Sequence, residues 1–211
     1  MSKSKILNLI VAHDINKGIS RNGEIPWKHM QDMKFFRNTT SRVCNISKSN
    51  ALIMGSGTFE KFIKFNTSSN RLIYVVTRNP QKYRNIVIPG LKIVSSVDSA
   101  IQLATSDSKI EEIFACSNIV YTHVLKHELV DKLYVTYIKE DHQCDNFIRD
   151  YSHLNICQKA RIYTDDKISI NEYFVNPIYH TVHKKLAISI HFYNNDTYFI
   201  NMCHYIKIYY L

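Results

Sequence analysis

The sequence predicts an α/β fold with a mostly parallel central sheet, flanking helices and an antiparallel hairpin near the C-terminus. Short apolar runs rich in β-branched residues alternate with segments of helical periodicity up to residue 138. Parallel strands need crossover connections of about a dozen residues or more, usually a helix, and the helical segments with their loops supply this length. Beyond residue 162 the chain carries further short β-rich runs, which are typical of hairpins.

The predicted strands share short length, apolar character and β-branched residues. They lie at Ile6–Ala12, Ala51–Met54, Leu72–Val76, Leu91–Val94, Ile113–Ala115 and Lys132–Ile138. The predicted helices are Lys28–Asn38, Thr58–Phe65, Ser96–Ala104 and Asn118–Lys126. The third helix has the clearest start, because the capping residue Ser96 is followed by an acid in the first turn, Asp98.

We expect one domain over residues 1–211, in which residues 162–211 form an extended, atypical β-rich segment. No internal repeat and no Pro- or Ser-rich linker marks a boundary. Strands are expected within Ala187–Tyr193 and Thr197–Tyr210. A turn is expected between them at Asn194–Asp196, because Asn and Asp favour turns.

The composition is that of an ordinary globular protein. Hydrophobic residues make up 45% of the 211 residues and charged residues 21%, with 5 Gly and 4 Pro, which excludes a disordered or collagen-like chain. The 5 Cys form no Cys-x-x-Cys pair, so we expect no metal site, no disulfide framework and a reducing, cytoplasmic location. No apolar run approaches the about 20 residues of a membrane span, and the N-terminal run lacks the small-residue cleavage site of a signal peptide.

The formal net charge is +9, from 27 Lys and Arg against 18 Asp and Glu. A basic chain attracts nucleic acid, anionic membranes or small anionic ligands. The basic residues are scattered rather than gathered in a stripe. We therefore expect general surface charge, with no nucleic-acid partner and no membrane partner.

The residues that point to chemistry follow the ends of predicted strands, where open α/β sheets bind ligands. After the first strand comes a long irregular loop, Gly18–Trp27, with two glycines, an Asn and a Pro, which ends in the only Trp of the chain. Five residues later the predicted helix carries Asp32, and a spacing of four residues puts Phe36 on the same helix face. We expect a carboxylate and an aromatic ring beside this loop.

These residues resemble the dihydrofolate reductase family. The family has a strand ending in Val-Ala, as Val11–Ala12 does, and then a loop with the pattern Gly-Ile-Gly-x-Asn-Gly-x-Leu/Ile-Pro-Trp, matched here with Ser20 in place of one Gly. An acid and, four residues on, an aromatic residue follow on the next helix. Further matching stretches give a resemblance over about residues 5–150, at Leu52–Phe59, Arg71–Arg78, Val94–Ala100, Lys132–Ile138 and Gln143–Phe147.

The resemblance implies a monomeric enzyme of one-carbon metabolism that reduces 7,8-dihydrofolate by hydride from NADPH and binds antifolates. Asp32 would accept two hydrogen bonds from the pteridine ring and assist protonation, Trp27 would hold a water and exclude solvent, and Thr136 would link to the acid through water. Arg71 would fork onto the glutamyl carboxylate, and Phe36 would stack on the ligand. The implied substrate contacts also include Ile10, Val11, Ala115 and Tyr121.

The resemblance places NADPH along the other strand ends. Thr58 is expected to cap a helix whose N-terminus faces the cofactor diphosphate, and Arg78 to select NADPH over NADH. Ser56 and Gly57 stand where the family often has a basic residue, which removes one expected contact. The implied cofactor contacts are Ala12, Gly18, Ile19, Asn22, Gly55, Ser56, Gly57, Thr58, Thr77, Arg78, Ser95, Cys116, Ser117, Asn118, Ile119 and Val120.

One position departs from the family pattern. The family carries Gly-Gly after its fifth strand, joined by a cis peptide bond against the cofactor, and this chain has Cys116–Ser117 there. Two added Cβ atoms crowd a place where backbone and ligand approach closely. Either the bond is trans and the loop moves, or the site tolerates the side chains. A nucleophilic Cys116 is not expected, because no His lies nearby in the pattern.

Several functions therefore stay open at the level of sequence. The first is an active dihydrofolate reductase, supported by the acid, the Trp, the Phe, the Arg and the Thr at matching offsets. The second is a non-catalytic or weakly active binding protein on the same fold, motivated by Cys116–Ser117 and Ser56. Nucleic-acid binding through the net charge, and a different pterin or pyrimidine reductase, are further alternatives.

Overall fold

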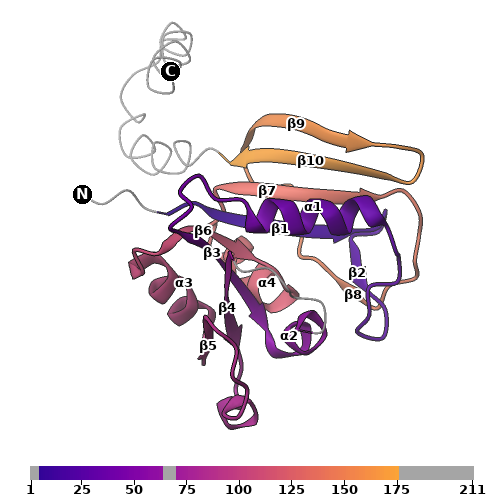
Figure 1. Ribbon diagram of the computed structural model, residues 1–211. Helices are drawn as coiled ribbons and strands as arrows, with labels where there is room; N and C mark the ends of the chain where they lie inside the picture. The colour runs from indigo at the N-terminus through magenta and orange to yellow at the C-terminus, as the bar shows by residue number, and fades with distance from the viewer. Residues whose placement is uncertain (1–4, 64–69, 176–211) are drawn as a thin grey trace, which may run out of the picture. The chain divides into compact units, whose positions relative to one another are not determined.

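Eight strands form one sheet in the computed structural model, which describes residues 5–63 and 70–175 (Figure 1). Across the sheet the strand order is β5–β4–β3–β6–β1–β7–β10–β9. The strands are β1 Leu7–His13, β3 Ser49–Gly55, β4 Arg71–Val76, β5 Leu91–Val94, β6 Ile110–Ala115, β7 Lys132–Ile138, β9 Ile156–Thr164 and β10 Ile168–Val175. The six strands from β5 to β7 pair in parallel, and β10 runs antiparallel to both β7 and β9. This confirms the predicted fold class.

The remaining elements cover the sheet or extend from it. Two short strands, β2 Gly18–Ser20 and β8 Asn146–Phe147, pair with each other in antiparallel fashion. The helices are α1 Met30–Ser41, α2 Ser56–Phe62, α3 Val97–Ser106 and α4 Asn118–Lys126, with a 3-10 turn at Pro80–Tyr83. None of the helices in the described residues is long and apolar enough to cross a membrane.

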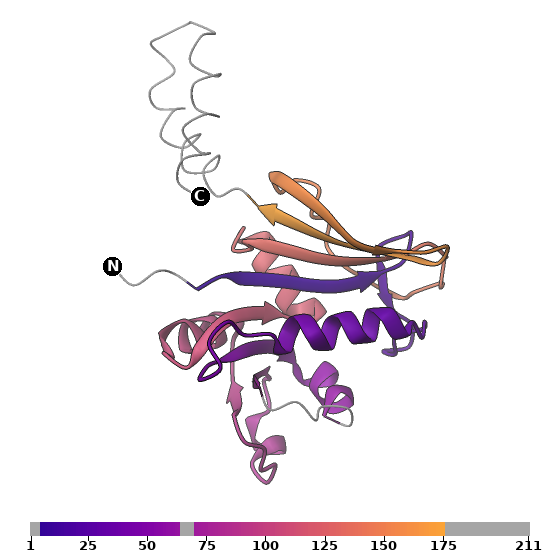
Figure 2. The same ribbon diagram turned by 45° about the horizontal axis from the view of Figure 1, so that its top comes forward.

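Alternating strand residues divide the core between the two faces of the sheet. On β1, Leu7, Leu9 and Val11 pack in one cluster with α3 and α4, while Ile10 points to the opposite face and packs in a second cluster. That second cluster contains Phe59 of α2 and lies against Phe35 of α1. Successive strand side chains point to opposite faces, so this division follows directly from the pleat. Figure 2 shows α1 running alongside β1.

The helix starts show which capping prediction holds and which is wrong. Ser96 caps α3 as predicted, because its Oγ accepts a hydrogen bond of 3.0 Å from the Ser99 N–H. The predicted cap at Thr58 is wrong. Helix α2 begins two residues earlier, at Ser56, with Gly55 at the N-cap position and no side-chain cap bond. Thr58 is therefore an exposed residue within the first turn of α2.

The first helix ends later than predicted. Instead of stopping at Asn38, α1 continues to Ser41. Thr40, the buried residue of its last turn, donates a hydrogen bond of 2.8 Å from its hydroxyl to the Phe36 carbonyl. This bond satisfies the hydroxyl inside the helix, which lets a β-branched polar residue extend the helix by another turn.

The C-terminal hairpin that the structure describes precedes the predicted one. It consists of β9 and β10, and its turn is at Asp165, whose Oδ1 accepts hydrogen bonds of 2.9 Å from Lys167 N–H and 2.8 Å from Ile168 N–H. An Asp side chain that bonds its own backbone two or three residues on is a common turn device. The β-rich part therefore begins at Ile156, not at residue 162. The predicted strands at 187–193 and 197–210 and the turn at 194–196 lie outside the described residues.

Replacing the α3 cap is expected to destabilise the protein measurably. Ser96→Ala removes the acceptor for Ser99 N–H and should lower the free energy of unfolding by about 1 kcal/mol. Urea unfolding measures this value. Ser108→Ala, at an exposed serine beyond the end of α3, is the matched control and should stay within about 0.5 kcal/mol of wild type. Equal stability of the two variants would contradict the capping role.

Candidate active site

A single carboxylate, Asp32, lies between α1 and the sheet. It is half-buried in the first turn of α1, and the Thr136 hydroxyl donates a hydrogen bond to it. Thr136 is near the end of β7, where it pairs with Ala12 of β1. Burial raises the pKa of the Asp32 carboxyl, although the Thr136 hydrogen bond and the nearby His29 both act in the opposite direction. The site therefore holds an acid that takes up a proton more readily than an exposed Asp.

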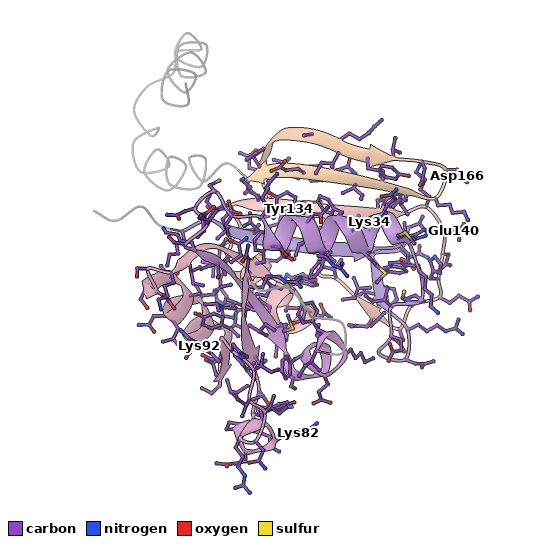
Figure 3. All side chains as sticks on the ribbon, in the orientation of Figure 1. Lys34, Lys82, Lys92, Tyr134, Glu140 and Asp166 are labelled. Carbon is purple, nitrogen blue, oxygen red and sulfur yellow. The ribbon has the colours of Figure 1, made fainter. Side chains whose placement is uncertain are left out.

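The packing of α1 directs Asp32 to the sheet. Phe35 contacts Tyr134 of β7 edge to face, with ring centroids 6.0 Å apart, and Figure 3 shows Tyr134 beside α1. Phe36 makes a similar contact with Phe62 of α2 at 6.1 Å. The two helical methionines, Met30 and Met33, point to solvent with exposed fractions of 69% and 61%. The aromatic pair therefore fixes which face of the helix carries the acid into the interior.

Trp27 closes one end of this region. Its side chain is buried in a small cluster with Ile138, Ile168 and Ile170, and the His142 ring lies 5.3 Å from it. The indole Nε1 is also buried and has no hydrogen-bond partner among the described residues. A buried N–H without a partner is costly, so it indicates an acceptor such as a water or a ligand atom at this point.

The loop that ends in Trp27 is held by two aspartates that the sequence analysis did not assign to the site. Asp14 Oδ1 accepts hydrogen bonds of 2.7 Å from Gly18 N–H and 2.9 Å from Asn16 N–H, and its Oδ2 accepts one from His142 N–H. Burial by itself raises the pKa of Asp14, but these bonds outweigh it, and the pKa lies below its usual value. Asp145 accepts a bond of 2.6 Å from Asn22 N–H. For Asp14, the signal in the sequence is an Asp directly after a strand end.

Gly18 is required where this loop begins. A Cβ built on Gly18 comes within 2.4 Å of the Cys144 Cβ and 2.9 Å of the Asp14 carboxylate. The Cys144 Cβ cannot move without its backbone, and the Asp14 carboxylate is held by its hydrogen bonds, so the loop leaves no space for a larger residue.

Arg71 lies at the far end of α1 from Asp32. It is the first residue of β4, its guanidinium donates a bond of 3.2 Å to the Thr40 hydroxyl, and its Cζ lies 5.3 Å from the centre of the Phe62 ring. Asp32 and Thr40 are eight residues apart on one helix, which corresponds to about 12 Å. Burial lowers the pKa of Arg71, whose ordinary value is so high that the group stays charged. The region therefore has a carboxylate at one end, aromatic rings along it and a guanidinium at the other.

The Cys116–Ser117 pair is accommodated by the protein. Every peptide bond in the described residues is trans. Cys116 packs in the second core cluster, which contains Ile10 and Phe59. Burial raises the pKa of its thiol, which keeps the group protonated. The Ser117 Oγ accepts a hydrogen bond of 2.8 Å from Gly55 N–H and so joins the ends of β6 and β3. Both side chains occupy defined places in the fold.

The predicted cofactor residues gather at the carboxyl ends of the parallel strands and on the elements that follow. Thr77 and Arg78 follow β4, Ser95 follows β5, and Asn118, Ile119 and Val120 form the first turn of α4. Arg78, Ser95 and Ile119 are exposed, as are Gly57 and Thr58 on α2 and Asn22 in the loop. Ile19 and Ser56 are partly buried.

Several predicted contact residues have side chains that point away from the α1 face. Val11, Ala115, Val120 and Tyr121 belong to the core cluster beneath α3 and α4. The Tyr121 hydroxyl donates a hydrogen bond of 2.8 Å to the Ile10 carbonyl, so it supports the β1 backbone from behind. Any ligand contact by these residues runs through backbone atoms. No group of three or more His, Cys, Asp or Glu side chains among residues 5–63 and 70–175 is arranged to hold a metal ion.

These features define an α/β protein with a half-buried carboxylate between a helix and the carboxyl ends of a parallel sheet. A family model described as dihydrofolate reductase matches residues 6–178. A dihydrofolate reductase of Heliothis virescens is 30% identical over 190 residues, which cover 88% of this chain and 100% of that protein. One from Aedes albopictus is 29% identical over 148 residues, covering 68% and 78% of the two chains. The chain therefore belongs to the dihydrofolate reductase family, whose members are NADPH-dependent oxidoreductases.

The fold agrees with this assignment. A solved structure, the dihydrofolate reductase from Enterococcus faecalis complexed with NADP(H) and RAB-propyl, superposes with a TM-score of 0.63 at 24% identity. The match covers 81% of this chain and 96% of that one. At this level of identity the similarity establishes the common fold.

Neutralising Asp32 is expected to stabilise the folded protein. Its pKa is raised in the folded state, so its protonation favours folding below the unfolded pKa, and that contribution is lost as pH rises through the folded pKa. Asp32→Asn should therefore raise the free energy of unfolding at pH 7 by roughly 1 kcal/mol, as removal of a strained functional group often does. The gain should shrink as pH falls toward 4.

Chemical denaturation of the ligand-free protein between about pH 4 and pH 8 measures this dependence. Asp166→Asn, at the exposed tip of the β9–β10 hairpin (Figure 3), is the matched control and should change stability little at any pH. A destabilised Asp32→Asn at pH 7 would show that the ionised carboxylate is not strained in the fold.

Proposed function

We propose that this chain reduces 7,8-dihydrofolate to 5,6,7,8-tetrahydrofolate with NADPH, which supports one-carbon transfer and thymidylate synthesis. The observation that carries the proposal is the half-buried Asp32 carboxylate, bonded by Thr136 and raised in pKa by burial. The family assignment supports this reaction, and the arrangement along α1 suits the roles given to each residue below.

Asp32 binds the pteridine ring. The ring offers an amino group and a ring N–H side by side, and a carboxylate accepts both as charge-assisted hydrogen bonds. Thr136 holds the carboxylate in place from β7. Because burial raises its pKa, the bound carboxylate also takes up a proton from water more readily than an exposed Asp and can pass it toward the ring nitrogen that must receive one during reduction.

Trp27 controls water at this end of the site. Its ring is buried and its N–H has no partner within residues 5–63 and 70–175, which suits one ordered water that relays a proton while bulk solvent is excluded. Phe36, which packs on Phe62, offers an aromatic edge to the middle of the ligand. These side chains orient the ring and limit the water that reaches it.

Arg71 binds the glutamyl end of the substrate. Its guanidinium is held by Thr40 and Phe62 about 12 Å along α1 from the level of Asp32, and that span suits a pteridine joined to a benzoylglutamate. The planar guanidinium group of an Arg can bind a carboxylate through two parallel hydrogen bonds, which a Lys cannot do, and this explains an Arg at this position.

The carboxyl ends of the strands fit NADPH. Ser117 is the N-cap residue of α4, but its side chain bonds Gly55 instead of capping the helix, so the positive end of α4 remains available to a phosphate. Asn118 in the same turn has a buried side-chain oxygen without a partner among the described residues. Arg78 adds exposed positive charge. When bound, the reduced nicotinamide supplies the hydride, and one proton is taken up for each hydride transferred.

The non-catalytic alternative is motivated by Cys116–Ser117, and the places of these side chains favour catalysis over it. Cys116 is in the core and Ser117 bonds Gly55, so each is accounted for by contacts within the protein. Titration of the folded protein with NADPH separates the two functions, since the absence of binding at millimolar concentration would support the alternative. The monomeric state, the cytoplasmic location and the lack of a nucleic-acid partner stay predictions.

Removing the charge of Asp32 is expected to abolish most of the activity. Asp32→Asn loses the charge-assisted bonds and the proton donor, and the rate of NADPH oxidation with dihydrofolate should fall by about 100-fold or more. The fall of near-ultraviolet absorbance measures this rate. Asp166→Asn should keep the wild-type rate. A wild-type rate in folded Asp32→Asn, or no turnover by the folded wild type, would refute the proposed reaction.

Shortening the fork at Arg71 is expected to weaken substrate binding without slowing the chemical step. Arg71→Lys should raise KM for dihydrofolate about tenfold and leave kcat within about twofold, because the glutamyl carboxylate is remote from the reacting atoms. An antifolate without a glutamyl group should bind the variant and the wild type equally. Arg84→Lys, at an exposed arginine, is the control. An unchanged KM would show that Arg71 has only a structural role.

A further inference from the structure

Three polar side chains from distant parts of the sequence form a chain of hydrogen bonds beside the predicted cofactor site. The Asn118 Nδ2 of α4 donates to the Asn146 Oδ1 of β8 at 2.6 Å. The Asn146 Nδ2 in turn donates to the Ser20 Oγ of β2 at 3.1 Å. All three side chains are partly buried, where hydrogen bonds compete less with water than on the open surface.

Asn146 connects the paired strands β2 and β8 to helix α4. The backbone pairs β2 with β8, with Ser20 opposite Asn146, and the Asp145 N–H donates a bond of 3.0 Å to the Ser20 carbonyl. These bonds hold the start of the Gly18–Trp27 loop against β8. The side-chain amide of Asn146 then connects this pair to the first residue of α4, whose N-terminus is the expected phosphate site.

Ser20 supplies an acceptor that glycine cannot. The family loop pattern has Gly at this position, and this chain has Ser. A second replacement of the family's glycine, Ser117, bonds Gly55 directly next to Asn118. The hydrogen-bonded side chains therefore run from Ser20 of β2 through Asn146 of β8 to Asn118 of α4, and Ser117, the preceding residue in the chain, separately bonds the end of β3.

We propose that Asn146 is a positioning residue for the cofactor, which joins the loop over the site to the first turn of α4. The bond to Asn146 fixes the amide nitrogen of Asn118, and its buried amide oxygen has no partner among the described residues. The same bond connects the β2 end of the loop to α4. A cofactor on α4 then binds a helix and a loop that are already connected. This inference rests on the proposed use of NADPH.

The test is calorimetric titration of the full-length protein with NADPH and, separately, with dihydrofolate. Asn146→Ala breaks both side-chain hydrogen bonds, and the Kd for NADPH should rise about tenfold, as expected for two such bonds. The Kd for dihydrofolate without cofactor should change less than twofold, because Asp32 and Arg71 are untouched. A merely structural role would weaken both ligands together.

Variants at Ser20 give a second, milder measurement. Ser20→Ala removes one bond and should raise the Kd for NADPH about threefold, whereas Ser20→Thr keeps the hydroxyl and should bind as wild type does. In the Asn146→Ala background, Ser20→Ala should have no additional effect, because the bond is already lost. Asn85→Ala, at an exposed asparagine after the 3-10 turn, is the control and should change neither Kd.

Two outcomes would overturn the inference, and a third would overturn its basis. Wild-type affinity for NADPH in Asn146→Ala, or an equal loss for both ligands, would show that the hydrogen-bonded chain does not position the cofactor. If the folded wild type itself failed to bind NADPH while it bound dihydrofolate, the proposed function would fall and this inference with it. The wild-type titration therefore separates the two failures.

Discussion

The site depends on one half-buried carboxylate on the face of a helix that lies against the sheet. Asp32 is held there because Phe35 and Phe36 bury the adjacent helix face against Tyr134 and Phe62, while Thr136 reaches it from the sheet. The ionised acid is unfavourable in that place, and the same environment makes it a good partner for a ring with paired N–H donors. The ionised Asp32 carboxylate therefore lowers the stability of the fold while it favours ligand binding, a trade-off that is common in active sites.

The sheet sets the geometry around that acid. Because six strands run in parallel, their carboxyl ends meet along one edge, and the loops after β1, β3, β4, β5 and β6 converge there. The antiparallel hairpin β9–β10 extends the sheet beyond β7, and its residues Ile168 and Ile170 pack around Trp27. The hairpin thus contributes to the wall of the site although it carries none of the predicted site residues.

Much of the fold follows from local sequence. Helix α4 and strands β5 and β7 have the predicted limits, because apolar periodicity and capping residues are local signals. The predicted cap at Thr58 is wrong because α2 has Gly55 at its N-cap position, where no side chain is available to mark the helix start in the sequence. Strand β9 was not predicted because the turn that pairs it with β10 depends on the single residue Asp165. The contacts of Asp14, Asp145 and Asn146 join residues more than 120 positions apart, and no local pattern encodes such pairs.

The position of Trp27 has a practical consequence. It is the only tryptophan among the 211 residues, and it lies buried between the Asp32 region and the His142 ring. Indole emission from this protein therefore arises from one place, beside the candidate active site. Ligand arrival, loop movement and protonation near the indole all act on that single emitter, so the unlabelled protein carries its own optical reporter of events in the site.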